Sequence, residues 1–170
     1  MATTPAVRRI AIVCLGNICR SPMADVILTD RLREAGLDVV VDSFGTGDWH
    51  VGKPMDSRAA ATLTTAGYDA TRHRASHFTD AEATAYDLVL AMDSANHADL
   101  LALGVPKERL KRFRDFDPAP GDGDVPDPYD GGDEGFRDVL ATVERTAAAI
   151  ATHVSGQGPA DVPTHSGGRR

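Results

Sequence analysis

Short apolar runs alternate with longer amphipathic stretches along most of the chain, and this order constrains the fold more than any other feature. The runs are rich in Val, Ile and Leu and too short for helices, whereas the longer stretches repeat apolar residues at helical spacing. The predicted strands are 7–13, 39–41, 88–92 and 110–113, and the predicted helices are 22–35, 57–66, 94–103 and 133–153. We therefore expect an α/β fold with a central four-stranded parallel sheet and helices on both faces.

The length of 170 residues fits a single domain. We expect this domain to occupy residues 1–154, because the last predicted helix ends there. The segment 155–170 (SGQGPADVPTHSGGRR) has no apolar periodicity, which predicts a flexible C-terminal tail. The net charge of −7 argues against nucleic acid or an anionic membrane surface as the main partner. No apolar run reaches the ~20 residues that a membrane span needs.

The chain has two cysteines, Cys14 and Cys19, in one short segment. A disulfide closing so small a loop would add little stability to a domain of this size. The apolar stretch after Arg8 and Arg9 is shorter than the core of a secretion signal and lacks a small-residue cleavage site. We therefore expect a cytoplasmic protein in which both thiols are reduced. Two reduced thiols in one loop favour a chemical role for these cysteines over a structural one.

The segment CLGNICRSP, residues 14–22, leaves the first predicted strand and enters the first predicted helix. A loop wound at a helix N-terminus points successive backbone N–H groups at one spot, where the helix dipole also favours an anion. Gly16 and Asn17 tolerate the left-handed conformations that such a loop needs. Arg20 can donate paired hydrogen bonds to phosphate oxygens. The segment therefore predicts a phosphate-binding loop that holds Cys14 as a thiolate nucleophile.

The plainest alternative is an unreactive cysteine at a strand end, followed by a surface arginine. Buried, inert cysteines are common, so Cys14 alone would favour that interpretation. It leaves the strand placement, the Gly-Asn pair, Arg20 and the helix-opening Ser-Pro pair as coincidences. We therefore prefer the phosphate-binding loop, which this context supports.

CLGNICRSP resembles the phosphate-binding signature of the low-molecular-weight protein tyrosine phosphatases at every position. The likeness continues in order through residues 42–43, 47–52, 73–75, 91–93, 116–118 and 127–129. It covers essentially the whole chain except the tail. The resemblance implies a hydrolase that removes phosphate from phosphotyrosine in protein substrates through a cysteinyl-phosphate intermediate on Cys14.

The resemblance also assigns roles to residues far from Cys14 in the sequence. It makes Asp127 the general acid and then the general base, whereas composition alone would make it one of several solvated acids. It makes Trp49 and Tyr129 the aromatic sides of a deep cleft that accepts a phenyl ring. The remaining residues of the implied phosphate-binding loop are Leu15, Gly16, Asn17, Ile18, Cys19 and Ser21, and the shell that supports the loop is Asn17, Ser21, Ser43 and His73.

We expect neither a metal ion nor a cofactor. The Asp-rich segment around Asp127 suggests a calcium loop, but Asp127 falls where such a loop needs a glycine. His73 and His77 lie four positions apart, yet no further ligands accompany them. Members of the family often carry a second tyrosine where this chain has Asp130, so the resemblance does not imply regulation through paired tyrosines.

Three other functions are alternatives. An arsenate reductase shares the fold and the loop but passes its oxidation to further cysteines, and this chain has none beyond Cys19. A phosphoarginine phosphatase carries Thr where this loop has Ile18, and an apolar side chain favours an aryl ester. A non-catalytic phosphate-binding or redox-sensing module has no need for Cys14, Arg20 and Asp127 together.

Cys19 has two interpretations. An activated thiolate at Cys14 is the form that peroxide oxidises first, and a nearby thiol can capture the resulting sulfenic acid as a reversible disulfide. Alternatively, Cys19 is a small apolar residue that packs beneath the loop. The family resemblance favours the protective, redox-regulatory role for the pair.

Overall fold

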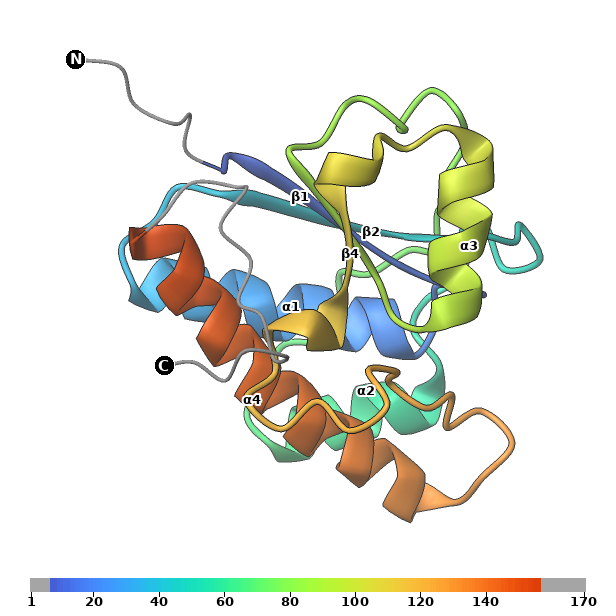
Figure 1. The fold of residues 1–170 in the computed structure, drawn as a ribbon. Coiled ribbons are helices and arrows are strands. Elements are labelled where there is room, and N and C mark those ends of the chain that lie inside the picture. Colours follow the sequence, from blue (N-terminus) through green and yellow to red (C-terminus); the bar gives the residue numbers. More distant parts are fainter. Residues whose placement is uncertain (1–6, 157–170) are drawn as a thin grey trace.

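The computed structural model describes residues 7–156 of the chain. Within them, four parallel strands form one sheet in the order β2-β1-β3-β4 (Figure 1). The strands are β1 (Arg9–Cys14), β2 (Val40–Gly45), β3 (Leu88–Ala91) and β4 (Leu110–Arg112). The prediction of a four-stranded parallel sheet is therefore confirmed.

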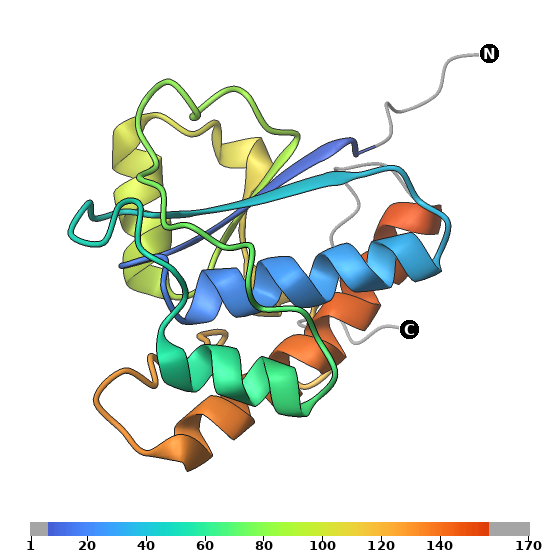
Figure 2. The same ribbon diagram turned by 180° about the vertical axis from the view of Figure 1, so that it is seen from behind.

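The sheet separates two layers of helices. Three of them, α1, α2 and α4, cover one face, whereas α3 lies on the other (Figures 1 and 2). The helices are α1 (Arg20–Glu34), α2 (Ser57–Thr65), α3 (Ser94–Leu103) and α4 (Asp133–Gly156), with short 3₁₀ helices at η1 (Lys107–Arg109) and η2 (Phe113–Phe116). None of the helices in this part of the chain is both long enough and apolar enough to cross a membrane.

β1 is buried on both faces because it lies between β2 and β3. Ile10 and Ile12 pack into the cluster formed with α1, α2 and α4, whereas Ala11 and Val13 pack into the cluster on the α3 side. This division follows the two-residue period of a strand, in which successive side chains point to opposite faces. A continuously apolar run is therefore what a central parallel strand requires.

The strand register brings three strand ends to one edge of the sheet. Cys14 pairs with Gly45 on one side, and Val13 pairs with Ala91 on the other. Ligands of open α/β sheets bind outside the carboxyl ends of the strands. The loops that follow β1, β2 and β3 therefore meet where a ligand site is expected.

β2 is longer than the sequence pattern predicts. The apolar run predicts a strand at 39–41 and a loop from Asp42, but β2 continues through Asp42 and Ser43 to Gly45 and pairs with the second half of β1. This prediction is wrong because β2 lies at the edge of the sheet, where a strand need not be apolar on both faces.

Two boundaries at the C-terminal end also differ from the predictions. Residues 113–116, predicted as a strand end and a loop, form η2. Helix α4 extends to Gly156, so residues 155 and 156 of the predicted tail are helical. The rest of that predicted tail, 157–170, lies outside the described residues.

Candidate active site

The loop between β1 and α1 turns at Asn17. This residue has a φ of 58° and is the one non-glycine residue with a positive φ in the described range. Asparagine visits the left-handed region more readily than most residues. With this geometry the Asn17 N–H donates to the Cys14 sulfur at 3.3 Å. The loop therefore curls around the sulfur atom.

The Asn17 side chain is fully buried behind the loop and uses all of its polar atoms. Its Nδ2 donates to the hydroxyls of Ser21 at 2.8 Å and Ser43 at 3.1 Å, and its Oδ1 accepts from the Ser76 N–H at 2.8 Å. The His73 Nε2 lies 2.7 Å from the Asn17 carbonyl oxygen. The four predicted supporting residues, Asn17, Ser21, Ser43 and His73, are thus in one hydrogen-bonded group.

Cys14 ends β1 and is only 3% exposed. Its sulfur lies 3.0 Å from the Ser21 hydroxyl oxygen. Asn17 donates to that oxygen, and the Ser21 O–H lies within reach of two acceptors, the sulfur and the Phe44 carbonyl oxygen at 3.3 Å. The N-terminus of α1 adds partial positive charge at the same place. The Cys14 sulfur therefore lies among hydrogen-bond donors at the start of a helix.

Arg20, the first residue of α1, is buried, and its Nη1 is held by two acceptors. Its Nη1 donates to Asp93 Oδ2 at 2.6 Å and to the Val125 carbonyl at 3.0 Å. Burial lowers its pKa, but the negative charges of Cys14 and the neighbouring carboxylates raise it overall above the ordinary value. Asp93 also caps α3, because its Oδ1 accepts from the Asn96 N–H at 2.8 Å. One carboxylate therefore fixes both a helix end and the guanidinium.

Asp127 lies across the cleft from the loop. Its Oδ2 is 3.5 Å from Arg20 Nη2, and its Oδ1 accepts from the Tyr129 N–H at 3.1 Å. The side chain is 44% exposed, so it remains accessible from the cleft. Val125, two residues earlier, donates its N–H to the Met92 carbonyl at 2.8 Å and ties this segment to the end of β3.

A cavity of about 180 Å³ joins these groups. It is lined by Cys14, Leu15, Gly16, Ile18, Cys19, Arg20, Trp49, His50, Asp127 and Tyr129. Trp49 and Tyr129 are 64% and 47% exposed, so neither is a core residue. The predicted cleft residues are therefore brought together at one site, while Asn17 and Ser21 lie behind it.

The Trp49 ring rests on the backbone of Gly47. A Cβ at Gly47 would lie 1.9 Å from Trp49 Cζ3, which no side chain can tolerate. Gly45 is similarly close to the loop, since its Cβ would meet the Leu15 carbonyl oxygen at 2.8 Å. Gly45, the last residue of β2, is thus required for the close approach of the phosphate-binding loop, and Gly47 leaves room for the Trp49 ring in its present position.

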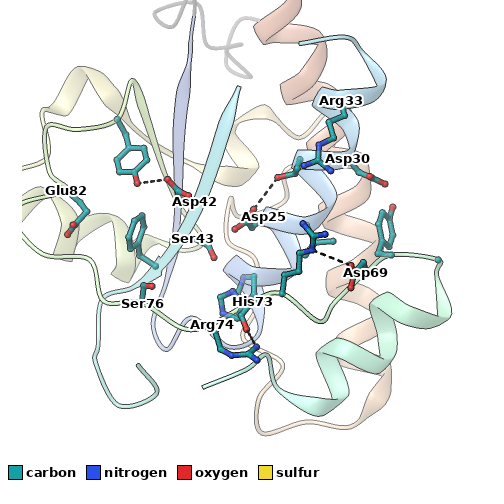
Figure 3. Close-up of a pocket in the computed structure, with 18 residues that line it drawn as sticks. Asp25, Asp30, Arg33, Asp42, Ser43, Asp69, His73, Arg74, Ser76 and Glu82 are labelled. Carbon is teal, nitrogen blue, oxygen red and sulfur yellow. Dashed lines mark hydrogen bonds and ion pairs between the residues drawn. The ribbon is translucent and has the colours of Figure 1, made fainter. Parts of the chain in front are cut away.

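A polar cavity of about 860 Å³ lies on the other side of the supporting residues (Figure 3). Asp25 from α1 and Ser43 from β2 both line it, and Asp25 Oδ1 accepts from the Thr29 hydroxyl at 3.3 Å. Burial raises the pKa of Asp25 to about 7, although the hydroxyls of Ser43 and Thr29 oppose the shift. Burial likewise lowers the pKa of His73. A hydrogen-bond chain therefore runs from this cavity through Ser43 to the loop.

The sequence model of the family "Low molecular weight phosphotyrosine protein phosphatase" matches residues 9–160. The chain belongs to this family. It is 42% identical over 157 residues to a low molecular weight protein-tyrosine-phosphatase of Streptomyces coelicolor, covering 88% of this chain and 94% of that protein. It is 47% identical over 140 residues to the low molecular weight protein-tyrosine phosphatase A of Mycobacterium tuberculosis, covering 79% of this chain and 84% of the relative.

Solved structures of the phosphatase family have the same fold. The low molecular weight phosphotyrosine phosphatase VcLMWPTP-2 of Vibrio cholerae has a TM-score of 0.82 at 33% identity, covering 89% of this chain and 99% of that one. A protein tyrosine phosphatase of Entamoeba histolytica has a TM-score of 0.82 at 29% identity, covering 87% and 97%. The resemblance read from the sequence is therefore confirmed at the level of family and fold.

Two residues of this phosphatase-family site were missed in the sequence. Asp93 follows β3 at the carboxyl edge of the sheet and precedes a helix, which is a signal that could have pointed to the site. Asp25 gave no such signal, because an acid on an amphipathic helix normally faces water. Between residues 7 and 156, no group of three or more His, Cys, Asp or Glu is arranged to hold a metal ion.

Cys19 is buried at the N-terminal end of α1 and forms no disulfide with Cys14. It lines the catalytic cleft and also packs in the core cluster. Burial raises the pKa of the Cys19 thiol well above its ordinary value, and the negative charge of Asp56 raises it further. Cys19 is therefore protonated at neutral pH.

Proposed function

We propose that this chain hydrolyses phosphotyrosine in proteins with Cys14 as nucleophile, Arg20 as phosphate-binding group and Asp127 as proton donor. The observation that carries the proposal is their convergence on one apolar-walled cleft at the carboxyl edge of the sheet. The family membership supports the same reaction. A thiol at the base of the cleft, an arginine fixed through its Nη1 with other N–H groups left to donate, and an accessible carboxylate match the three roles in turn.

In the first step the Cys14 thiolate attacks phosphorus, and the bond from phosphorus to the phenolic oxygen breaks. The leaving phenolate takes a proton from the Asp127 carboxyl group, so that tyrosine departs neutral. In the second step a water molecule attacks phosphorus through its oxygen. Asp127, now a carboxylate, takes a proton from this water. The sulfur–phosphorus bond breaks, which releases inorganic phosphate and regenerates the Cys14 thiolate.

The loop amides and Arg20 bind the phosphoryl oxygens in both steps. The planar guanidinium suits the charge that spreads over the equatorial oxygens in the transition state. Asp93 and the Val125 carbonyl hold the guanidinium in place, so that little reorganisation is needed during the reaction.

The cleft walls select an aryl ester. Trp49 and Tyr129 flank the opening, and Ile18 contributes an apolar side chain. A phosphoserine side chain is too short to bring its phosphate to Cys14, which is 3% exposed. The phosphorylated guanidinium of phosphoarginine, whose phosphorus is bound to nitrogen, would lack a hydrogen-bonding partner at Ile18.

The proposal is tested with one enzyme preparation and four substrates. We expect phosphotyrosine peptides to be hydrolysed with a much larger kcat/KM than phosphoserine peptides or phosphoarginine, and no thiol-dependent reduction of arsenate. Rapid quenching during turnover should trap one phosphate per chain on Cys14. Preferred turnover of phosphoarginine, or reduction of arsenate, would contradict the proposal.

We further propose that Cys19 protects Cys14 from over-oxidation in a reducing, cytoplasmic setting. Both thiols are free and line the same cavity. Oxidation by hydrogen peroxide forms a sulfenic acid on Cys14, and attack by Cys19 expels water and forms a disulfide. Since the attacking form is the thiolate, the raised pKa of Cys19 predicts capture that speeds up as pH rises.

The test compares wild type with Cys19→Ser after treatment with peroxide and then a thiol reductant. Wild type should recover most of its activity, whereas Cys19→Ser should retain sulfinic or sulfonic acid on Cys14 by mass spectrometry. Equal recovery of the two proteins would leave Cys19 as a packing residue only.

A further inference from the structure

A second hollow, of about 470 Å³, lies directly beside the catalytic cleft. It is lined by Leu15, Thr46, Gly47, Trp49, His77, Phe78, Thr79, Asp80, Asp99, Leu100 and Leu103. Leu15 and Trp49 line the catalytic cleft as well, so the two cavities share a wall. We call this second cavity the side groove.

The side groove leaves apolar surface in contact with water. Leu15 is 43% exposed, Trp49 is 64% exposed and Leu103, at the end of α3, is 39% exposed. Large apolar side chains that gather at a hollow and remain exposed to water often mark a site where another molecule binds. The groove adjoins the cleft where the phosphotyrosine would bind, because Leu15 and Trp49 line both, so a bound substrate is the occupant that reaches it first.

The charge of the side groove has one sign. The carboxylates of Asp80 and Asp99 line it, and no Lys or Arg does. Neither carboxylate pairs with a basic side chain within residues 7–156. The remaining titratable residue in the lining is His77, whose Nε2 lies 3.2 Å from the Thr46 carbonyl oxygen. A cationic group is therefore the complementary ligand.

We infer that the side groove is a substrate subsite for the side chain of a lysine or arginine close to the phosphotyrosine. Such a side chain has an apolar stem, which would pack on Leu15 and Leu103, and a cationic head, which would reach Asp80 and Asp99. An extended peptide advances about 3.3 Å per residue, so a neighbour of the phosphotyrosine within about three positions reaches the adjacent groove. The inference rests on the proposed phosphatase activity and names its substrate class.

The experiment uses phosphotyrosine peptides that differ at one position. Lysine, norleucine or glutamate is placed in turn at each position within about three residues of the phosphotyrosine. For each enzyme, kcat/KM for a peptide is divided by kcat/KM for phenyl phosphate, which is too small to reach the groove. At one position or more, the normalised kcat/KM of the lysine peptide should exceed that of the norleucine peptide by roughly 3- to 10-fold, which is what ion pairs with two exposed carboxylates contribute. The value for the glutamate peptide should fall below that for the norleucine peptide.

Three variants make the test specific. Asp80→Asn with Asp99→Asn should erase the preference for lysine over norleucine, and Asp99→Lys should reverse it in favour of glutamate. The matched control is Asp38→Asn with Asp138→Asn, which removes the same net charge from two exposed acids outside the groove. This control should retain the preference. In wild type the preference should shrink at 1 M salt, where the Debye length is ~3 Å.

Two results would overturn the subsite. One is equal kcat/KM for lysine, norleucine and glutamate at every position. The other is an equal loss of the preference in the groove variant and in the control, which would assign it to net charge. Failure of the proposed function would look different, because phenyl phosphate and all the peptides would then go unhydrolysed.

Discussion

The two sides of the phosphate-binding loop are built differently. On the cleft side, Trp49, Tyr129 and Asp127 are substantially exposed and have few hydrogen bonds to the rest of the protein. On the rear side, Asn17 and Ser21 are fully buried and hydrogen-bonded to one another. The cleft side is therefore free to meet substrate, while the rear side holds the loop in its left-handed turn.

This difference predicts two kinds of variant. Removing a group on the cleft side should change chemistry or specificity and leave the folded state nearly as stable, because little packing is lost. Removing a group on the rear side should leave buried polar atoms without partners and cost stability as well as rate. Measuring turnover and thermal unfolding on the same variants tests the division directly.

The largest effect is expected at the nucleophile. Cys14→Ser should abolish turnover, because a serine hydroxyl in this loop is not ionised at neutral pH and burial keeps the neighbouring Cys19 thiol protonated. Vanadate or phosphate should still bind, since the loop amides and Arg20 remain. Turnover assays and calorimetric binding of vanadate measure the two properties. Substantial turnover by purified Cys14→Ser would contradict the covalent mechanism.

Asp127→Ala should lower kcat by about 10²–10⁴-fold for phosphotyrosine, the usual contribution of a general acid. The loss should shrink for phenols that leave without a proton, such as nitrophenols. Thermal unfolding should change little, because the Asp127 side chain is 44% exposed. An equal loss for good and poor leaving groups would show that Asp127 is not the proton donor.

On the rear side, Asn17 can be tested with a matched pair of variants. Asn17→Ala and Asn17→Gly both remove the buried amide, which should lower stability and slow turnover by about 10- to 100-fold through misplacement of the loop. Of the two replacements, only glycine tolerates the φ of 58° without strain. The alanine variant should therefore be less stable than the glycine variant by about 1–2 kcal/mol. Equal stability of the two would mean that the turn relaxes when the side chain is lost. Chemical denaturation and steady-state assays measure both effects.

The sequence predicted the cleft side better than the rear side. Cys14, Gly16 and Arg20 lie in one short segment, so strand placement and residue type suffice to indicate an anion-binding turn. The rear side joins residues that are far apart in the chain and depends on β2 continuing past Asp42, which the apolar pattern did not reveal.

The roles of Asp93 and Asp25 also depend on residues that are far from them in the sequence. The role of Asp93 depends on the guanidinium that it meets 73 positions away. The burial of Asp25 depends on how α1 packs against β2 and on the segment that carries His73. Periodicity along a single helix cannot supply either contact.

The smallest effect on turnover is expected at Asp25, which lines the polar cavity together with Ser43 and is separated from the Cys14 sulfur by Ser43, Asn17 and Ser21. Burial raises its pKa from 3.8 in the unfolded chain to about 7. The folded chain therefore binds this proton more tightly than the unfolded chain, and stability from this group falls as pH rises between those two values.

Asp25→Asn keeps an oxygen that can accept from Thr29 but cannot ionise. Its melting temperature relative to wild type should therefore rise between about pH 4 and pH 7 and level off above, by roughly 2–4 °C for each kcal/mol of relief. The matched control is Asp38→Asn, an exposed acid just beyond the same helix, whose difference from wild type should not follow this trend. If the difference in melting temperature between Asp25→Asn and wild type stayed constant across this pH range, the Asp25 carboxyl would not have the raised pKa that this prediction assumes. A loss of turnover as large as that of Asn17→Ala would instead make Asp25 part of the loop support and extend the rear side into the polar cavity.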